Sequence, residues 1–301
     1  AQGVDRVTCV PGESYLAVLD ALHDTGIDVL TCRAEGGAAM MAEAHGKLTG
    51  RPGVCFVTRG PGATNASHGV HIAMQDSTPM ILFVGQIETG MREREAFQEL
   101  DYRAVFGTMC KWATEIDDPA RIPELVGRAF RVAMQGRPGP VVIALPENML
   151  VQTATVADVP RVVPAASAPA ADDLGRLGAM LAAARRPLVI LGGSGWDEAA
   201  VLAMGEFATA WGLPVCTSFR RADRFPWNHP CYAGDLGIGP SPRLAARAKE
   251  ADLLLLVGGR MSEMPSSSYT LLDVPVPRQT LVHVHPGAEE LGRVYAPALA
   301  I

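Results

Sequence analysis

Short apolar runs recur along the chain and alternate with longer segments of mixed polarity. Runs such as residues 54–58 and 80–84 show no alternation of polar and apolar positions. This pattern is typical of strands in parallel sheets, whose two faces are both covered by helices. We therefore predict an α/β sheet with helices between its strands, and we place the strands at residues 7–10, 28–32, 54–58, 80–84 and 141–145.

The second half of the chain repeats this alternation after a change in composition. Residues 160–171 are rich in Pro and Ala and poor in large apolar side chains, which indicates a semi-extended linker. We therefore predict two doubly wound parallel-sheet domains, residues 1–155 and 172–301, joined by a Pro/Ala-rich linker at 156–171. The second is a smaller Rossmann-like unit with a helix at 198–211 and strands at residues 187–191, 215–217, 253–257 and 280–284.

Composition excludes several classes of partner and location. The 301 residues are 48% hydrophobic, which is enough to bury a core in each domain. The formal charge is 26 − 32 = −6 without a basic run, so we expect no nucleic acid and no membrane as partner. No apolar stretch approaches the roughly 18–20 residues of a membrane span. The first residues lack the pattern of a signal peptide, and six scattered cysteines without a CxxC pair predict a cytoplasmic location.

A single carboxylate, Glu35, stands where a predicted strand meets a predicted helix. It is followed by glycines, alanines and methionines, and an acid among small apolar residues is costly to bury without a partner. The start of a helix favours its negative charge. We therefore regard Glu35 as a candidate to exchange a proton with a ligand. The alternative is that it only caps the helix.

A glycine-rich turn follows the next predicted strand, in the run Arg59-Gly60-Pro61-Gly62. Such a turn from a strand into a helix lets a ligand approach the backbone closely. The full dinucleotide fingerprint is missing, because Asn65 stands at the third glycine position. The turn therefore indicates a ligand site without indicating a dinucleotide.

Several such segments follow one another along the chain: Val10-Pro11-Gly12-Glu13, Arg33-Ala34-Glu35-Gly36-Gly37, Thr58-Arg59-Gly60-Pro61-Gly62-Ala63-Thr64-Asn65, Gln75-Asp76-Ser77-Thr78-Pro79, Val84-Gly85-Gln86, Ala96-Phe97-Gln98-Glu99 and Gly136-Arg137-Pro138-Gly139. Taken together, they resemble the large subunit of acetolactate synthase and its thiamine diphosphate-dependent relatives over at least residues 4 to 150. The resemblance implies that the first domain binds the aminopyrimidine ring of thiamine diphosphate. It also implies that Glu35 hydrogen-bonds a ring nitrogen, which promotes loss of the thiazolium proton.

The reaction implied by the resemblance is decarboxylation of a 2-oxo acid with transfer of the enamine to an acceptor. The family usually has a histidine before the glutamate, and Ala34 stands there in this chain, which leaves the donor and acceptor open. Each other matching residue can instead be core, surface or helix cap. The residues implied to face the substrate are Phe97, Gln98 and Lys111, and those implied to bind the cofactor are Pro11, Gly12, Thr58, Pro61, Asn65 and Gln86.

Metal and nucleotide signals are weaker. The family holds Mg²⁺ and the diphosphate in a third domain through Gly-Asp-Gly and a downstream asparagine pair. Here Leu236 follows Gly234-Asp235 and no asparagine comes later. We therefore expect that the third domain is absent, that no metal binds these residues, and that the chain alone is inactive. His283 and His285 share a strand face, but no acidic or thiol partner lies near them in sequence.

The glycine turns at residues 192–195 and 258–260 could cradle phosphates or could simply be tight turns. FAD is therefore possible but not predicted. Three functions remain open: the carboligase, a 2-oxo acid decarboxylase or aldehyde lyase on the same scaffold, and a non-catalytic nucleotide-binding subunit. The resemblance implies a homodimer or homotetramer.

Overall fold

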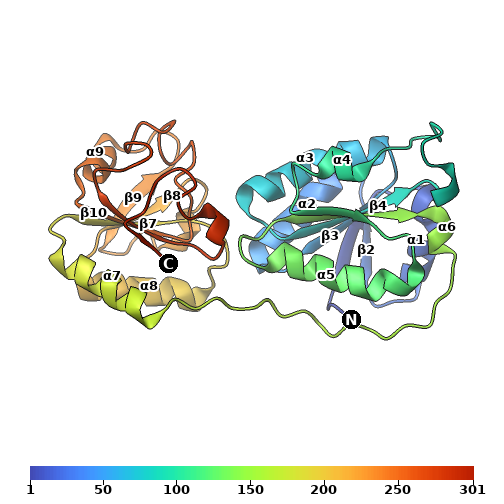
Figure 1. The fold of residues 1–301 in the computed structure, drawn as a ribbon, viewed down its shortest axis with the longest axis horizontal. Coiled ribbons are helices and arrows are strands. Elements are labelled where there is room, and N and C mark those ends of the chain that lie inside the picture. The colour runs from blue at the N-terminus through green and yellow to red at the C-terminus, as the bar shows by residue number, and fades with distance from the viewer. The chain divides into compact units, whose positions relative to one another are not determined.

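The computed structural model describes all residues, 1–301, as two compact units, Ala1–Ala165 and Ala166–Ile301. The boundary between them falls inside the segment 156–171 that the sequence predicts as linker. Each unit is a twisted sheet with helices on its faces (Figure 1). The two sheets are all-parallel, which confirms the predicted fold class of two α/β units.

The first unit has six strands in the order β2-β1-β3-β4-β6-β5. All five predicted strands of this unit are present, within two residues at each end. The sixth strand, β5, was not predicted. The strands are β1 Arg6–Cys9, β2 Asp28–Thr31, β3 Gly53–Val57, β4 Met80–Gln86, β5 Trp112–Glu115 and β6 Pro140–Pro146.

Helices cover both faces of this sheet. The longer ones are α1 Leu16–His23, α2 Glu35–Thr49, α3 Pro61–Asp76 and α5 Ile122–Met134; the shorter ones are α4 Tyr102–Phe106, α6 Glu147–Leu150 and the 3₁₀ turns η1 Glu13–Tyr15, η2 Thr89–Met91 and η3 Pro119–Arg121.

Local sequence explains the ends of the two helices that flank the site. Helix α2 ends at Gly50, whose φ of 68° is the left-handed conformation that glycine adopts without steric cost. Helix α3 has Pro61 at its first position, where the missing N–H leaves no helical bond unmade. The two helices lie close together because small residues face each other: a Cβ on Gly69 would lie only 2.5 Å from the Cβ of Ala39.

The second unit has the strand order β12-β11-β10-β7-β8-β9. Counted along the chain this is the doubly wound order 3-2-1-4-5-6, with the switch in direction between β7 and β10. The four predicted strands are present, while the edge strands β9 and β12 were not predicted. The elements are α7 Ala171–Ala183, β7 Pro187–Leu191, α8 Glu198–Trp211, β8 Val215–Ser218, η4 Ala222–Arg224, β9 Tyr232–Leu236, α9 Pro242–Glu250, β10 Leu253–Val257, β11 Thr280–Val284, η5 Ala288–Glu290 and β12 Leu299–Ala300.

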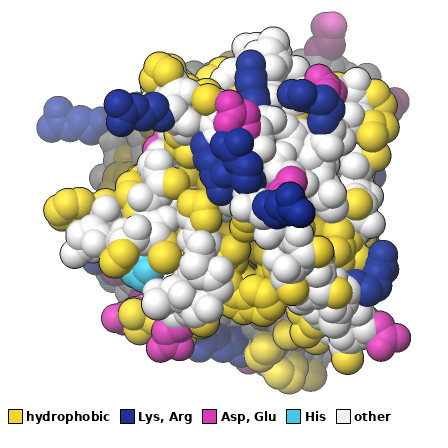
Figure 2. Space-filling view, turned by 90° about the vertical axis from the view of Figure 1, so that its left-hand side faces the viewer, with side chains coloured by type: hydrophobic (Ala, Val, Ile, Leu, Met, Phe, Trp, Pro, Cys, Tyr) yellow, Lys and Arg dark blue, Asp and Glu magenta, His cyan; other side chains and the backbone are white.

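The surface of the second unit mixes side chains of every kind. On the face drawn in Figure 2, Lys and Arg side chains stand among hydrophobic ones, with Asp and Glu between them. Across the whole unit the most exposed large hydrophobic side chains are Trp227 and Ile238, at 81% and 76%. None of the helices in either unit is long and apolar enough to cross a membrane.

Burial predicts which leucines of the first unit matter for stability. Leu82 lies in the middle of β4 and is fully buried, so Leu82→Ala should lower the free energy of unfolding by about 2–5 kcal/mol through lost packing and the remaining cavity. Leu48, near the end of α2, is 85% exposed and serves as the matched control. Chemical denaturation of the two variants measures the difference, and equal effects would contradict the assigned core.

Candidate functional site

The first sheet is built outward from β1 to both sides. From β1 the chain passes to β2 on one side and then to β3 on the other. After the carboxyl ends of β1 and β3 the chain therefore continues toward opposite sides of the sheet, and ligands of doubly wound sheets bind at such a switch point. Gly12 follows β1 and Thr58 follows β3, so the structure brings these two predicted residues together there.

The two loops are in direct contact. A Cβ on Gly12 would lie 2.4 Å from the Cβ of Thr58, so only glycine fits opposite this threonine. The Oγ atoms of Ser14 and Thr58 are 2.8 Å apart, and the Arg59 N–H donates to Ser14 Oγ at 3.3 Å. Ser14 is fully buried. The close contact at Gly12 and the hydroxyl pair of Ser14 and Thr58 thus hold the two loops together at the switch point.

Glu35 is the first residue of α2 and is partly exposed. The Asn65 side-chain amide donates to Glu35 Oε2 at 3.2 Å. A Cβ on Gly62 would lie 3.5 Å from Glu35 Oε1, and Oε1 has no hydrogen-bond partner. One oxygen of the carboxylate is thus held by Asn65, and the other can accept a proton or a hydrogen bond.

Asn65 does not cap helix α3. It lies within the helix, and Gly60, with a φ of 57°, occupies the capping position. The capping alternative for Asn65 is therefore wrong. Its role in the structure is to orient Glu35 across the contact between α3 and α2.

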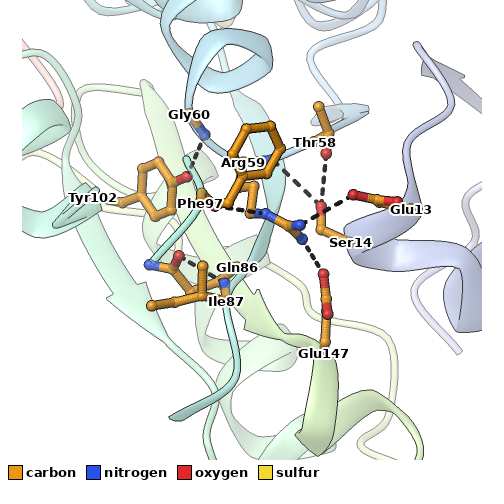
Figure 3. Close-up of polar contacts among 10 residues, drawn as sticks. All are labelled: Glu13, Ser14, Thr58, Arg59, Gly60, Gln86, Ile87, Phe97, Tyr102 and Glu147. Atoms are coloured by element: carbon orange, nitrogen blue, oxygen red, sulfur yellow. Dashed lines mark hydrogen bonds and ion pairs between the residues drawn. The ribbon is translucent and has the colours of Figure 1, made fainter. Parts of the chain in front are cut away.

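A buried arginine, Arg59, connects the strand ends (Figure 3). Its Nη2 lies 3.2 Å from Glu13 Oε1, its Nη1 is ion-paired with Glu147, and its Nε donates to the Phe97 carbonyl at 3.1 Å. The next residue, Gly60, donates its N–H to the Tyr102 hydroxyl at 2.8 Å. Burial raises the pKa of Tyr102 to about 12, so this hydroxyl stays neutral.

Sequence reasoning missed this network around Arg59. Its signal was a charged residue between a fully apolar strand and a glycine turn, a place where an unpaired charge would be costly. The partners Glu13 and Glu147 lie 46 and 88 residues away along the chain, so spacing could not identify them.

Three further predicted residues lie beside this network. Gln86 ends β4 and is buried; its amide donates to the Leu100 carbonyl at 2.9 Å, and its oxygen accepts from the Ile87 N–H at 2.9 Å. Gln98 adopts a φ of 64° and packs against Gly60, where a Cβ would lie 2.7 Å from the Cβ of Gln98. The Phe97 ring is 71% exposed. The structure thus places Gln86 as the anchor of a loop that carries Phe97 and Gln98.

The remaining predicted residues are placed differently. Pro11 and Pro61 are exposed next to the glycines of their turns. Lys111 precedes β5 and so lies at the amino edge of the sheet, opposite the switch point, where its Nζ donates to the Gln135 carbonyl at 2.6 Å. The structure does not bring Lys111 together with the other site residues, and its assignment to the substrate stays a prediction that this unit does not support.

In the second unit the glycine-rich turns after β7 and β10 pack against each other at the switch point. A Cβ on Gly193 would lie 1.8 Å from the carbonyl oxygen of Gly258, so the turns after β7 and β10 touch directly. The close approach explains these glycines without a phosphate. Trp196 Nε1 and Arg221 Nε donate to the carbonyls of Gly192 and Gly193, both at 2.8 Å.

His283, in β11, and His285, just after it, also form hydrogen bonds within the protein. His283 Nε2 lies 2.9 Å from the Gly259 carbonyl, and the Gly287 N–H donates to His285 Nδ1 at 3.0 Å. Burial lowers the pKa of both imidazoles, which keeps them neutral. The structure contains no group of three or more His, Cys, Asp or Glu side chains that could hold a metal ion.

Two matches to protein families each fall within one unit of the structure. Residues 1–105 match the thiamine pyrophosphate enzyme N-terminal TPP binding domain, and residues 174–301 match the thiamine pyrophosphate enzyme central domain. The first match contains the loops around Glu35 and Thr58, and the second contains the whole sheet of the second unit.

Individual relatives extend this similarity along the chain. The acetolactate synthase isozyme 2 large subunit of Escherichia coli (strain K12) is 31% identical over all of this chain and 54% of the relative, and the acetolactate synthase of Bacillus subtilis (strain 168) is 30% identical over all of this chain and 52% of the relative. The sulfoacetaldehyde acetyltransferase of Rhodobacter capsulatus is 31% identical over 86% of this chain and 44% of the relative. The chain spans about half the length of the curated relatives that it matches.

The contact between the glycine turn and Thr58 generates a stability prediction with an internal rescue. A Cβ at position 62 would lie 2.8 Å from Thr58 Cγ2, so Gly62→Ala should destabilise the first unit by about 1–3 kcal/mol, the usual range for an overpacked site. The substitution Thr58→Ser removes Cγ2, so the double variant should regain most of this loss. Thermal unfolding of the single and double variants measures the coupling. Purely additive effects would show that the two positions do not touch.

Proposed function

Because this chain belongs to the thiamine pyrophosphate enzyme family, we propose that it forms the pyrimidine-binding and central parts of an acetolactate synthase-like carboligase. The observation that carries the proposal is the Glu35 carboxylate. One of its oxygens is fixed by Asn65, and the other faces a glycine at a sheet switch point.

The residues at this edge fit the aminopyrimidine ring of thiamine diphosphate. Gly12 and Gly62 add no side chains of their own and let the two turns pack around Thr58, with Gly62 beside the Glu35 carboxylate. A ring with a basic nitrogen needs an acid, and Glu35 Oε1 is an acceptor without a partner. When bound, thiamine diphosphate supplies the carbon nucleophile that attacks a 2-oxo acid and allows CO₂ to leave.

The chain's own residues orient the reactants and move a proton. Glu35 Oε1 holds or accepts the proton shared with the heterocycle, while Asn65 keeps the carboxylate from turning toward solvent. Positioned acid–base groups of this kind contribute about 10²–10⁴-fold to a rate.

The identity of the acceptor rests on the relatives. Acetolactate synthases match the chain from end to end, whereas the sulfoacetaldehyde acetyltransferase matches 86% of it. This favours a 2-oxo acid donor and a second 2-oxo acid as acceptor. Ala34 keeps a simple decarboxylase or aldehyde lyase as the second candidate, because the family's histidine is missing there.

The remaining parts of the proposal concern the whole protein. We include Mg²⁺ held outside these 301 residues, as the family resemblance implies, and we derive no step through the metal. A homodimer or homotetramer and a cytoplasmic location belong to the same proposal. Six unpaired cysteines agree with a reducing compartment.

Product analysis tests the reaction itself. Full-length protein incubated with pyruvate, thiamine diphosphate and Mg²⁺ should consume pyruvate and form acetolactate. Acetaldehyde as the main product would favour the decarboxylase instead. Unchanged pyruvate, together with no consumption of any other 2-oxo acid, would refute both enzymatic functions.

The carboxylate of Glu35 can be tested without changing its shape. In the full-length enzyme, Glu35→Gln should lower turnover by about 10²–10⁴-fold, since the amide accepts from Asn65 but cannot share the proton. The thermal unfolding midpoint should hardly change. Glu124→Gln, at a fully exposed ion pair with Arg121, is the matched control and should keep the wild-type rate. A near-normal rate for Glu35→Gln would remove this residue from the mechanism.

A further inference from the structure

Arg59 reaches three other segments of the first unit from one buried position. Its side chain is only 9% exposed. Glu13 comes from η1 after β1, Glu147 begins α6 after β6, and Phe97 lies in the loop between β4 and α4. A guanidinium offers five donors in a rigid fork, which suits it to hold several groups at once. Arg59 therefore ties the ends of three strands to one loop (Figure 3).

The loop that Arg59 holds is under backbone strain. Three of its residues other than glycine, Glu93, Glu95 and Gln98, have φ values of 62°, 54° and 64°. Residues with a Cβ are unfavourable in this left-handed region, and such a conformation persists only when the surroundings hold it. The loop thus depends on contacts with the rest of the unit.

Few contacts join this loop to the sheet. The Glu99 carboxylate accepts from the N–H groups of Glu93 and Ala96, but these bonds lie within the loop. At its ends, Arg92 is ion-paired with Glu115 and the Leu100 carbonyl is held by Gln86. Between these ends, the bond from Arg59 to the Phe97 carbonyl and the packing of Gln98 on Gly60 hold the loop.

The charges around Arg59 exclude a role as receptor for the substrate carboxylate. Two carboxylates, those of Glu13 and Glu147, surround one guanidinium, so the cluster carries a net charge of −1. An anionic 2-oxo acid would be repelled there. The Phe97 ring also lies 6.0 Å from the guanidinium carbon, on the side of the loop.

We propose that Arg59 is a positioning residue whose guanidinium holds the Phe97–Gln98 segment against the turn after β3, and so sets where these side chains stand relative to Glu35. This role deepens the proposed function and rests on it for its catalytic consequence. In this proposal the ion-paired Arg59 sets the position of the exposed Phe97 ring and the Gln98 amide at the edge of the site, and these two side chains contribute to substrate specificity.

Hydrogen exchange of the full-length protein without ligands tests the positioning directly. Within residues 94–100 the N–H groups of Ala96 and Glu99 donate hydrogen bonds, and in Arg59→Met these amides should exchange about tenfold faster or more, because a charge-assisted tie is lost. Amides of β3 and β4 should keep their wild-type rates. Water can solvate the freed carboxylates, since Glu13 and Glu147 are 70% and 35% exposed, so the unit should remain folded.

Matched variants separate this role from a general loss of stability. Arg59→Lys keeps the charge but not the fork, so it should restore part of the protection. Arg121→Met removes an exposed arginine from the ion pair with Glu124 and should change nothing in the loop. Unchanged exchange at residues 94–100 in Arg59→Met, or equally faster exchange throughout the sheet, would overturn the proposal. If Arg59→Met does not fold, Glu147→Gln takes its place and should still speed exchange in this loop alone.

Kinetics then connects the loop to the reaction. Arg59→Met should lower kcat/KM for pyruvate by about tenfold or more, the effect of misplacing groups that contact the substrate, and Arg59→Lys should recover most of it. An unchanged kcat/KM would overturn the catalytic consequence. Absence of thiamine diphosphate-dependent turnover in the wild-type protein would refute the proposed function, while the exchange experiment still decides whether Arg59 holds the loop.

Discussion

The site depends on how closely two backbone turns approach each other at the carboxyl edge of a parallel sheet. β1 and β3 are neighbours, so the chain that follows each must pass the other within a few ångströms. Gly12 makes this possible opposite Thr58, and Gly62 makes it possible beside Thr58 and Glu35. Because close packing leaves no room for a Cβ, glycine at these positions lets the two turns meet and brings the Glu35 carboxylate beside the turn after β3.

Carboxylates at this edge have two different roles. Glu13 and Glu147 neutralise a buried arginine, and their charge is used inside the protein. Glu35 is held by an uncharged amide, so its charge and one of its oxygens remain available for a ligand. A neutral orienting partner is what a proton-sharing acid needs, because a cation in that place would bind the carboxylate itself. The geometry alone thus separates the acid we assign to chemistry from the acids that fasten the scaffold.

The two units use the same architecture differently at their switch points. In the first, the turns leave a carboxylate facing glycine backbone. In the second, the turns after β7 and β10 press backbone against backbone, and Trp196 and Arg221 bind their carbonyls. Packing thus accounts for the glycines of both switch points, and the first unit differs in that Gly62 also lies beside a carboxylate, that of Glu35.

The sequence by itself determined the interior strands of both sheets and the position of the acid that we propose for the chemistry. Interior strands are covered on both faces, so their composition is strongly apolar and their positions could be read directly; β5, β9 and β12 were missed because they lie at sheet edges, where less burial is required. The order of the motifs indicated Glu35, Gly12, Thr58 and Asn65 as candidate site residues. Only the tertiary structure showed that Asn65 orients Glu35, that Lys111 lies at the opposite edge, and that Arg59 joins Glu13, Phe97 and Glu147. These contacts join residues 30 to 88 positions apart, and such pairings are set by the order of strands in the sheet, which no local pattern encodes.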